Sequence, residues 1–315
     1  MEKLLSLVIP AYNEEENIAH TAAVVRDILT AAEIPYEIVF INDGSKDHTW
    51  EAIVAAAEAD PTVKGVCFSR NFGKESAMFA GLYHAQGACC VIMDCDLQHP
   101  PEKIVEMYRL WEQGYEVVEA VKADRGRESF AYKVSAKCFY GLISHATGID
   151  MMRASDFKLL DRKAMNVLLN MQEKKAFFRA LSSWIGFRTT QVEFEVQERA
   201  AGQSKWSPKS LIKYALSNLT SFSTAPMQIV TVLGVVMLVF SLVLGISTLY
   251  NKIVGAAAVG FTTVIMVQLF TGSVLMISIG IIGYYIACIY EEIKQRPRFI
   301  VEETVGDVPD KPPVG

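Results

Sequence analysis

The sequence predicts an α/β domain with a mostly parallel sheet, followed by an amphipathic helix and a hairpin of two transmembrane helices. Three observations lead to this prediction. Short apolar runs alternate with helix-length segments in the first half of the chain, which is typical of βαβ units. A segment with an apolar helical stripe begins near residue 207. From Pro226 to Tyr290 the only charged residue is Lys252, so this part is apolar enough to cross a membrane.

Composition narrows the classes of function. The 315 residues are 51% hydrophobic and carry a formal net charge of −5, so we expect no nucleic-acid partner. The six cysteines form no C-x-x-C pair, which argues against a disulfide framework and fits a reducing, cytosol-facing domain. No Gly-x-Gly-x-x-Gly follows the first apolar run, and no Walker sequence occurs. Dinucleotide oxidoreductases and P-loop NTPases are therefore disfavoured.

The first half of the chain contains four short apolar runs that we expect to be buried strands. They cover residues 4–9, 37–41, 63–68 and 91–96. Acidic residues 14–16 follow the first run and are expected in the first turn of a helix. Parallel strands collect the loops that follow them at one edge of the sheet, where α/β folds bind ligands. Those loops are residues 10–14, 42–47, 70–74 and 94–98.

Two carboxylates, Asp94 and Asp96, follow the fourth strand. Hard oxygen donors on one short turn suit Mg²⁺ or Mn²⁺, which bind through one or two carboxylates together with substrate phosphates. Cys95 lies between them and is interpreted as a packing residue, because hard cations prefer oxygen. A solvated turn after a strand is the alternative for this motif taken alone.

Four motifs occur in order at suitable spacing: Val8–Glu14, Asn42–Asp47, Arg70–Lys74 and Asp94–Gln98. The set resembles the Rossmann-like GT-A domain of family 2 inverting glycosyltransferases, here residues 1–206. The resemblance implies a nucleotide-sugar donor and a metal. It assigns Pro10, Ala11, Tyr12, Glu14 and Asp43 to the base and ribose, and Asp94, Asp96 and Gln98 to the metal and diphosphate. Taken singly, Asn13 and Asp43 also suit helix capping.

Basic residues gather after residue 116. They suit either a solvated helix surface or a basic site that binds a phosphate. The pattern resembles the polyprenyl-phosphate subgroup of the family, in which such residues hold the lipid phosphate. By position these are Arg125, Arg127, Lys133 and Ser135.

Asp156 matches the position of the proposed catalytic base in this family, and Asp96 is the second residue that the resemblance assigns to catalysis. A phosphate monoester is mostly ionised at neutral pH and needs little deprotonation. Asp156 could instead orient the sugar or the phosphate, or form a cap or a salt bridge with Arg153.

A loop at residues 199–206 resembles the family sequence Arg-x-x-Gly-x-Ser-Lys-Trp/Tyr. The resemblance implies that the loop closes over the donor diphosphate, with Arg199, Lys205 and also Lys74 as donor-binding residues. Positive charge at a departing diphosphate lowers the barrier to transfer. A plain basic loop before a membrane segment is the alternative.

The apolar composition of the last third of the chain predicts membrane attachment. We expect an amphipathic interfacial helix at residues 207–224 and two spans within 225–290, at about 226–250 and 261–287. A tail follows at residues 291–315. Lysine and arginine lie on both outer flanks of the hairpin, so the positive-inside rule predicts a cytoplasmic catalytic domain and two cytoplasmic termini.

Over nearly its whole length the chain resembles bacterial bactoprenol glucosyltransferases, and its catalytic domain also resembles dolichol-phosphate mannose synthases. The resemblance implies inverting transfer of a hexose, with UDP-glucose favoured, to undecaprenyl or other polyprenyl phosphate at the bacterial inner membrane, for modification of cell-envelope glycans. Alternatives are transfer of an aminoarabinose derivative, N-acetylglucosamine or mannose, and a non-catalytic sensor or scaffold. A homo-oligomer and a partner flippase or downstream glycosyltransferase are also expected. Tyr284 and Cys288 replace the usual Glu and Arg of the second span, which puts subunit or flippase contacts in doubt.

Overall fold

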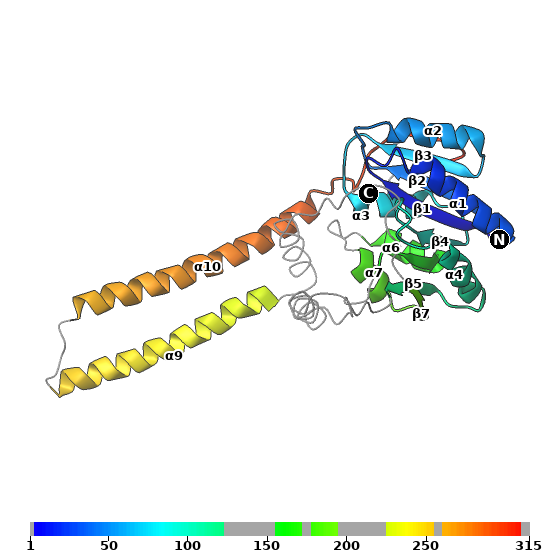
Figure 1. Ribbon diagram of the computed structural model, residues 1–315. Coiled ribbons are helices and arrows are strands. Elements are labelled where there is room, and N and C mark those ends of the chain that lie inside the picture. The colour runs from blue at the N-terminus through cyan, green and yellow to red at the C-terminus, as the bar shows by residue number, and fades with distance from the viewer. Residues whose placement is uncertain (1–2, 123–154, 172–177, 195–224, 255–259, 310–315) are drawn as a thin grey trace. The chain divides into compact units, whose positions relative to one another are not determined.

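The computed structural model describes residues 3–122, 155–171, 178–194, 225–254 and 260–309. Its contacts divide the chain into two units. One consists of Met1–Trp206 with Arg296–Gly315, and the other of Ser207–Gln295. The first unit contains a mixed β-sheet covered by helices, and the second contains two long helices (Figure 1).

The sheet of the described part has eight strands in the order β7-β5-β6-β4-β1-β2-β3-β8. The strands are β1 (Leu5–Ala11), β2 (Tyr36–Asn42), β3 (Val63–Phe68), β4 (Cys89–Ile92), β5 (Val117–Lys122), β6 (Lys158–Asp161), β7 (Thr189–Phe194) and β8 (Val301–Val305). The central strands β4, β1, β2 and β3 are parallel. Strand β6 lies antiparallel between β4 and β5, and β8 lies antiparallel to β3. The predicted α/β fold is confirmed.

Helices cover both faces of this sheet. Helices α1 (Ile18–Ala31), α2 (Thr49–Ala59) and α4 (Glu102–Glu112) pack on one face, and α3 (Lys74–His84) and α6 (Arg162–Asn170) pack on the other. A short helix, α7 (Phe178–Trp184), contacts α6.

The central strands are buried because apolar side chains point to both faces. Leu7 and Ile9 of β1 belong to the core beneath α1, whereas Val8 points to α3. Helix α3 approaches closely at Gly81, where a Cβ atom would overlap Val8. This two-sided burial explains why the strands are continuous apolar runs in the sequence.

The start of α1 differs from the expectation. Residues 14–16 were expected in the first helical turn, but α1 begins at Ile18 and has no acidic residue in its first turn. The backbone amide of Asn13 donates to Ser45 Oγ (3.0 Å), and that of Glu14 donates to Thr49 Oγ1 (2.8 Å). These bonds hold the segment in a turn against the loop that follows β2, and Asn13 adopts a left-handed φ of 55°. The prediction of a helix here is wrong.

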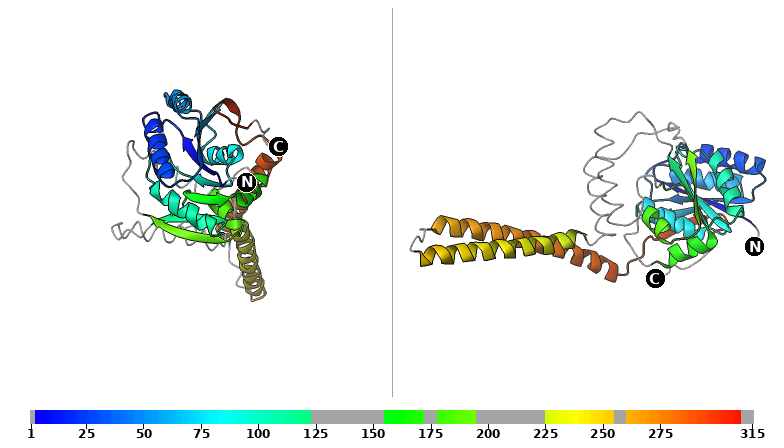
Figure 2. Two further views of the ribbon diagram at one scale, coloured as in Figure 1. Left: turned by 90° about the vertical axis from the view of Figure 1, so that its right-hand side faces the viewer. Right: turned by 90° about the horizontal axis from the view of Figure 1, so that it is seen from below.

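The second unit consists, where described, of α9 (Ala225–Ile253) and α10 (Phe261–Ile293), which run side by side in opposite directions (Figures 1 and 2). Both are long and apolar enough to cross a membrane, over Val230–Ile253 and Val264–Ile293, with mean hydropathies of 2.6 and 2.1. The two predicted spans fall on these helices. The amphipathic helix expected at residues 207–224 lies outside the described residues.

The segment that follows α10 belongs to the first unit and supplies strand β8. Phe299 stacks on Phe68 with ring centroids 5.2 Å apart, and Trp50 Nε1 donates to Glu303 Oε2 at 2.8 Å. The sequence analysis described this segment only as a tail. The structure adds a strand that covers the edge of β3.

Candidate active site

The candidate site lies at the edge of the sheet where β4 ends and its antiparallel neighbour β6 begins. These strands are antiparallel neighbours, and Ile92 of β4 pairs with Lys158 of β6. Asp94 lies two residues after the pair on one strand, and Asp156 lies two residues before it on the other. Strand pairing therefore brings together two carboxylates that are 62 positions apart in the sequence. Lys74, the first residue of α3, reaches the same place.

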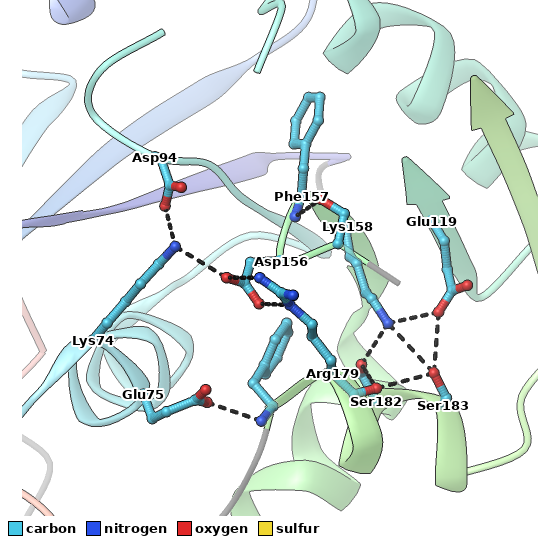
Figure 3. A network of polar contacts seen from close by, with 12 residues as sticks. Lys74, Glu75, Asp94, Glu119, Asp156, Phe157, Lys158, Arg179, Ser182 and Ser183 are labelled. Carbon is cyan, nitrogen blue, oxygen red and sulfur yellow. Dashed lines mark hydrogen bonds and ion pairs between the residues drawn. The ribbon is translucent and has the colours of Figure 1, made fainter. Parts of the chain in front are cut away.

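Figure 3 shows the ion network at this edge. Lys74 Nζ lies 2.5 Å from Asp94 Oδ1 and 3.0 Å from Asp156 Oδ2. Arg179 of α7 donates from Nε to Asp156 Oδ1 at 2.6 Å and from Nη2 to Asp156 Oδ2 at 2.9 Å. The side chain of Asp156 is 8% exposed, whereas those of Asp94 and Arg179 are each 32% exposed. Asp156 thus lies beneath a layer of charged groups that solvent reaches.

The network fixes the charge of its members. Burial alone would raise the pKa of Asp156, but Lys74 and Arg179 outweigh burial and hold that pKa far below its usual range. Burial would likewise lower the pKa of Lys74, yet Asp156 and Asp94 raise it. The pKa of Asp94 is lowered because Lys74 outweighs the effect of burial. All three side chains are therefore ionised at neutral pH.

The predicted metal ligands Asp94 and Asp96 lie in the loop after β4, and both are partly exposed. Asp96 Oδ1 accepts from the backbone amide of Gln98 at 3.2 Å, and the amide of Asp94 donates to His99 Nδ1 at 3.3 Å. The His99 ring stacks on Phe157 with centroids 4.9 Å apart. These contacts hold the loop against the start of β6.

The donor atoms of this loop suit a hard divalent cation. Within the described residues, no three His, Cys, Asp or Glu side chains gather in an arrangement that could hold a metal. Mg²⁺ and Mn²⁺ are commonly bound through one or two carboxylates, with substrate phosphates completing the coordination. Asp94 and Asp96 provide such a pair, so the residues present fit a cation that arrives with a phosphorylated substrate.

The predicted donor-binding residues lie at the same edge. Ala11 is buried at the end of β1, and Pro10, Tyr12 and Glu14 around it are partly exposed. Asp43 follows β2 and is 3% exposed. Its carboxylate accepts from the backbone amides of Phe72 (2.6 Å) and Gly73 (2.9 Å).

Asp43 therefore fixes the two residues that precede α3, whereas the capping interpretation expected it to cap the helix that follows it in the sequence, α2, whose N-cap residue is His48. Burial raises the pKa of Asp43, although the two backbone hydrogen bonds oppose this. A neighbouring glycine keeps the two loops close, because a Cβ atom on Gly44 would overlap the backbone of Arg70 and Asn71. The start of α3, and with it Lys74, is thus positioned by the loop after β2.

Some predicted residues fall outside the described part, namely Arg125, Arg127, Lys133, Ser135, Arg199 and Lys205. Conversely, the sequence analysis missed Arg179, Glu75 and His99. Glu75 accepts from the backbone amide of Phe178 at 2.9 Å, and burial raises its pKa to about 7. The contacts of Arg179 with Asp156, of Glu75 with Phe178 and of the His99 ring with Phe157 depend on tertiary packing, so the sequence gives no spacing that reveals them.

Comparison with known proteins identifies the family. Residues 6–169 match the family described as Glycosyl transferase family 2. The chain belongs to this family. Uncharacterized glycosyltransferase YkcC of Bacillus subtilis (strain 168) is 39% identical over 96% of this chain and 94% of its own length. The prophage bactoprenol glucosyl transferase homolog of Escherichia coli (strain K12) is 38% identical over 95% of this chain and 98% of its own.

Among solved structures, glucosyl-3-phosphoglycerate synthase from Mycobacterium tuberculosis, in complex with Mn²⁺ and UDP-glucose, matches 68% of this chain and 76% of its own, with 17% identity and a TM-score of 0.46. The resemblance to family 2 glycosyltransferases that the sequence motifs indicated is confirmed by the family match and by the near full-length relatives. The matched residues include Lys74, Asp94, Asp96 and Asp156. The network of Figure 3 therefore lies largely within the glycosyl transferase region.

Proposed function

We propose that this glycosyltransferase moves a hexose, with glucose favoured, from a nucleoside diphosphate sugar, with UDP favoured, to a polyprenyl phosphate. One observation carries the proposal: relatives named bactoprenol glucosyl transferase, such as that of Shigella phage SfV, are 38% identical over 95% of this chain. The alignment extends beyond the catalytic residues, because 95% coverage must include most of the two apolar helices. A lipid acceptor accounts for a catalytic domain joined to such helices.

The reaction that we propose is a single in-line displacement. An oxygen of the lipid phosphate attacks the anomeric carbon of the sugar, the bond from that carbon to the diphosphate breaks, and the nucleoside diphosphate leaves with the electron pair. Attack from the face opposite the leaving group inverts the anomeric configuration. The attacking oxygen is mostly ionised at neutral pH, because the second pKa of a phosphate monoester is near 6.

The residues of the ion network would act on the departing charge. Asp94 and Asp96, with Gln98 as the third predicted ligand, would hold Mg²⁺ or Mn²⁺. When bound, such a cation supplies Lewis-acid stabilisation of the diphosphate. Lys74 lies 2.5 Å from Asp94 and adds a second positive charge. Pro10, Ala11, Tyr12, Glu14 and Asp43 would surround the base and ribose.

We propose that the acceptor enters from the membrane side. Arg125, Arg127, Lys133 and Ser135 would bind the lipid phosphate, and Arg199 and Lys205 would close over the diphosphate. Lys294 and Arg296 follow the second helix and Lys213 precedes the first, which favours cytoplasmic placement of both flanks. The sugar would then be added at the cytoplasmic face, where nucleotide sugars are available.

A substrate panel tests this proposal. Purified protein is incubated with undecaprenyl phosphate, Mg²⁺ or Mn²⁺, and one radiolabelled donor at a time, covering UDP- and GDP-sugars. We expect lipid-extractable label that depends on the acceptor and is greatest with UDP-glucose. If another nucleotide sugar gives the most lipid label, the proposed reaction stands and only the identity of the donor changes. Absence of lipid label with every donor, despite binding of UDP, would favour a sensor or scaffold.

A further inference from the structure

The loop that joins β3 to α3 covers residues 69–73 and leads directly into Lys74, the first residue of the helix. One side of this loop is held by Asp43. Its carboxylate accepts from the backbone amides of Phe72 at 2.6 Å and Gly73 at 2.9 Å. These hydrogen bonds connect the loop to the end of β2.

On another side, aromatic rings connect the loop to the segment that follows α10. The ring of Phe299 stacks on that of Phe68, with centroids 5.2 Å apart and an interplanar angle of 12°. Phe68 is 1% exposed, and its ring meets that of Phe72 at 90° with centroids 5.7 Å apart. The backbone amide of Ser69 donates to the carbonyl of Ile300 at 3.1 Å. The segment therefore holds the start of the loop through its backbone and the end of the loop through its ring.

The same segment contacts the helix that carries Lys74. The guanidinium of Arg298 lies 4.3 Å from the centroid of the Phe79 ring in α3. The ring centroid of Phe299 lies 6.5 Å from that of Tyr83, in the same helix. The segment thus packs against the chain on both sides of Lys74.

We propose that Phe299 is a positioning residue for the nucleotide-sugar donor, and that it acts through Phe68 and Phe72. Protein interiors are close-packed. Without the Phe299 ring, Phe68 would move or border a cavity, and either change weakens its support of the Phe72 ring. A loop that is less ordered in the free protein must be ordered when the donor binds, which lowers affinity. The inference rests on the proposed function, in which Asp43 and Lys74 bind the donor.

Phe299 lies only six residues after Ile293, the last residue of α10. The chain that leaves the second predicted membrane span therefore supports the donor side of the site. The catalytic domain expected at residues 1–206 would lack this ring.

Variants of the full chain in detergent test the proposal. Phe299→Ala removes the ring, Phe299→Leu keeps most of its volume, and Phe299→Tyr keeps the ring. Val305→Ala is the matched control, because Val305 lies in the same segment, pairs with Gly65 of β3 and packs against the core. The readouts are the dissociation constant of UDP by calorimetry, the KM values for UDP-glucose and undecaprenyl phosphate, and the melting temperature.

We expect Phe299→Ala to weaken UDP binding and raise the KM for UDP-glucose about tenfold, and to leave the KM for undecaprenyl phosphate within about twofold of wild type. Phe299→Leu should lose about threefold in UDP affinity, because it fills the space without a flat ring. Phe299→Tyr should bind UDP as wild type does. Val305→Ala should lower the melting temperature and leave UDP affinity unchanged, since Val305 pairs three positions away from Phe68 along β3.

A double-mutant cycle tests the route through the rings. Phe72→Leu removes the ring at the loop end of this route. Phe299→Ala should therefore cost about tenfold in UDP affinity in the wild-type background and less than about threefold in the Phe72→Leu background.

Three results would overturn the proposal. The first is unchanged UDP affinity in both Phe299→Ala and Phe299→Leu. The second is an equal loss of UDP affinity in Val305→Ala, as expected if general destabilisation were the cause. The third is an equal loss from Phe299→Ala in both backgrounds of the cycle.

Two provisions keep the test decisive. If Phe299→Ala does not fold, Phe299→Leu carries the comparison, including the cycle with Phe72→Leu. If wild type binds UDP and transfers no sugar to lipid, the proposed function fails, whereas the UDP affinities of the variants still test Phe299.

Discussion

At the scale of single residues, the charge of Glu75 depends on pH within the physiological range. Its carboxyl is largely desolvated by burial and also lies near Asp156, and these effects raise its pKa from 4.5 to about 7. The hydrogen bond from the Phe178 amide and the charges of Arg179 and Lys74 oppose the rise. The folded state therefore binds the Glu75 proton more tightly than the unfolded state does.

Glu75→Gln should change the pH dependence of stability. Because the folded-state pKa is raised, the wild type loses stability as pH increases from about 4.5 to about 7, by at most about 3 kcal/mol. Glutamine keeps an acceptor for the Phe178 amide and has no proton to lose. Thermal melts at pH 5 and pH 8 should therefore show a larger decrease for wild type than for the variant. Equal decreases for the two proteins would contradict a raised pKa of Glu75 in the folded state.

Lys74 occupies an oxygen of Asp94 that a divalent cation would use. Lys74→Gln removes a competing positive charge 2.5 Å from Asp94 Oδ1. In the absence of nucleotide, Mn²⁺ should therefore bind about fivefold more tightly to the variant, as measured by electron paramagnetic resonance. Lys46→Gln, a change at an exposed lysine of the loop after β2, is the control and should leave Mn²⁺ affinity unchanged. Equal Mn²⁺ affinity in wild type and Lys74→Gln would mean that Lys74 does not compete.

At the scale of elements, β8 connects the end of the chain to the sheet of the first unit. Phe299 stacks on Phe68, and Val305 packs against the main core. Truncation after Arg298 removes both side chains and leaves β3 as an unpaired edge. We expect a loss of roughly 3 kcal/mol, which corresponds to a decrease in melting temperature of roughly 6–12 °C.

Truncation after Pro309 retains β8 and serves as the control for this prediction. It should melt within about 2 °C of wild type, since a change of 1 kcal/mol shifts a unit of this size by about 2–4 °C. If the two truncated proteins melt at the same temperature, β8 does not stabilise the sheet.

The elements also differ in how far the sequence predicts them. The four central strands were predicted because burial on both faces makes them apolar runs. Strand β8 has the sequence Val-Glu-Glu-Thr-Val and exposes its three central residues, so its composition is that of a polar tail. Strand β7 exposes three of its six residues. Edge strands of this kind are defined by their pairing partners, which local sequence does not specify.

The residues of the candidate site also differ in how far the sequence predicts them. Asp94 and Asp96 follow a recognisable strand, so spacing and residue type predicted them. The meeting of Asp94 with Asp156 depends on the antiparallel register of β6 against β4. The contact of Arg179 with Asp156 depends in addition on the packing of α7. Only the tertiary structure joins these residues.

At the scale of the whole molecule, the chain combines a glycosyl transferase domain with two helices that are long and apolar enough to cross a membrane. In our account the glycosyl transferase domain binds a water-soluble donor, and the two helices keep the protein at the membrane, where the lipid acceptor lies. In the same account, the carboxylate pair Asp94 and Asp96 would hold the donor diphosphate through a divalent cation. Transfer to lipid should therefore depend on this pair.

The most direct test measures lipid-extractable hexose formed from UDP-glucose and undecaprenyl phosphate by wild type and Asp96→Asn, with Mn²⁺ or Mg²⁺ present. Asp27→Asn, at an exposed surface aspartate, is the matched control. We predict acceptor-dependent transfer by wild type and Asp27→Asn, abolished by chelation of the metal, and a loss of about a hundredfold or more in Asp96→Asn. Transfer by Asp96→Asn at the wild-type rate would contradict the account.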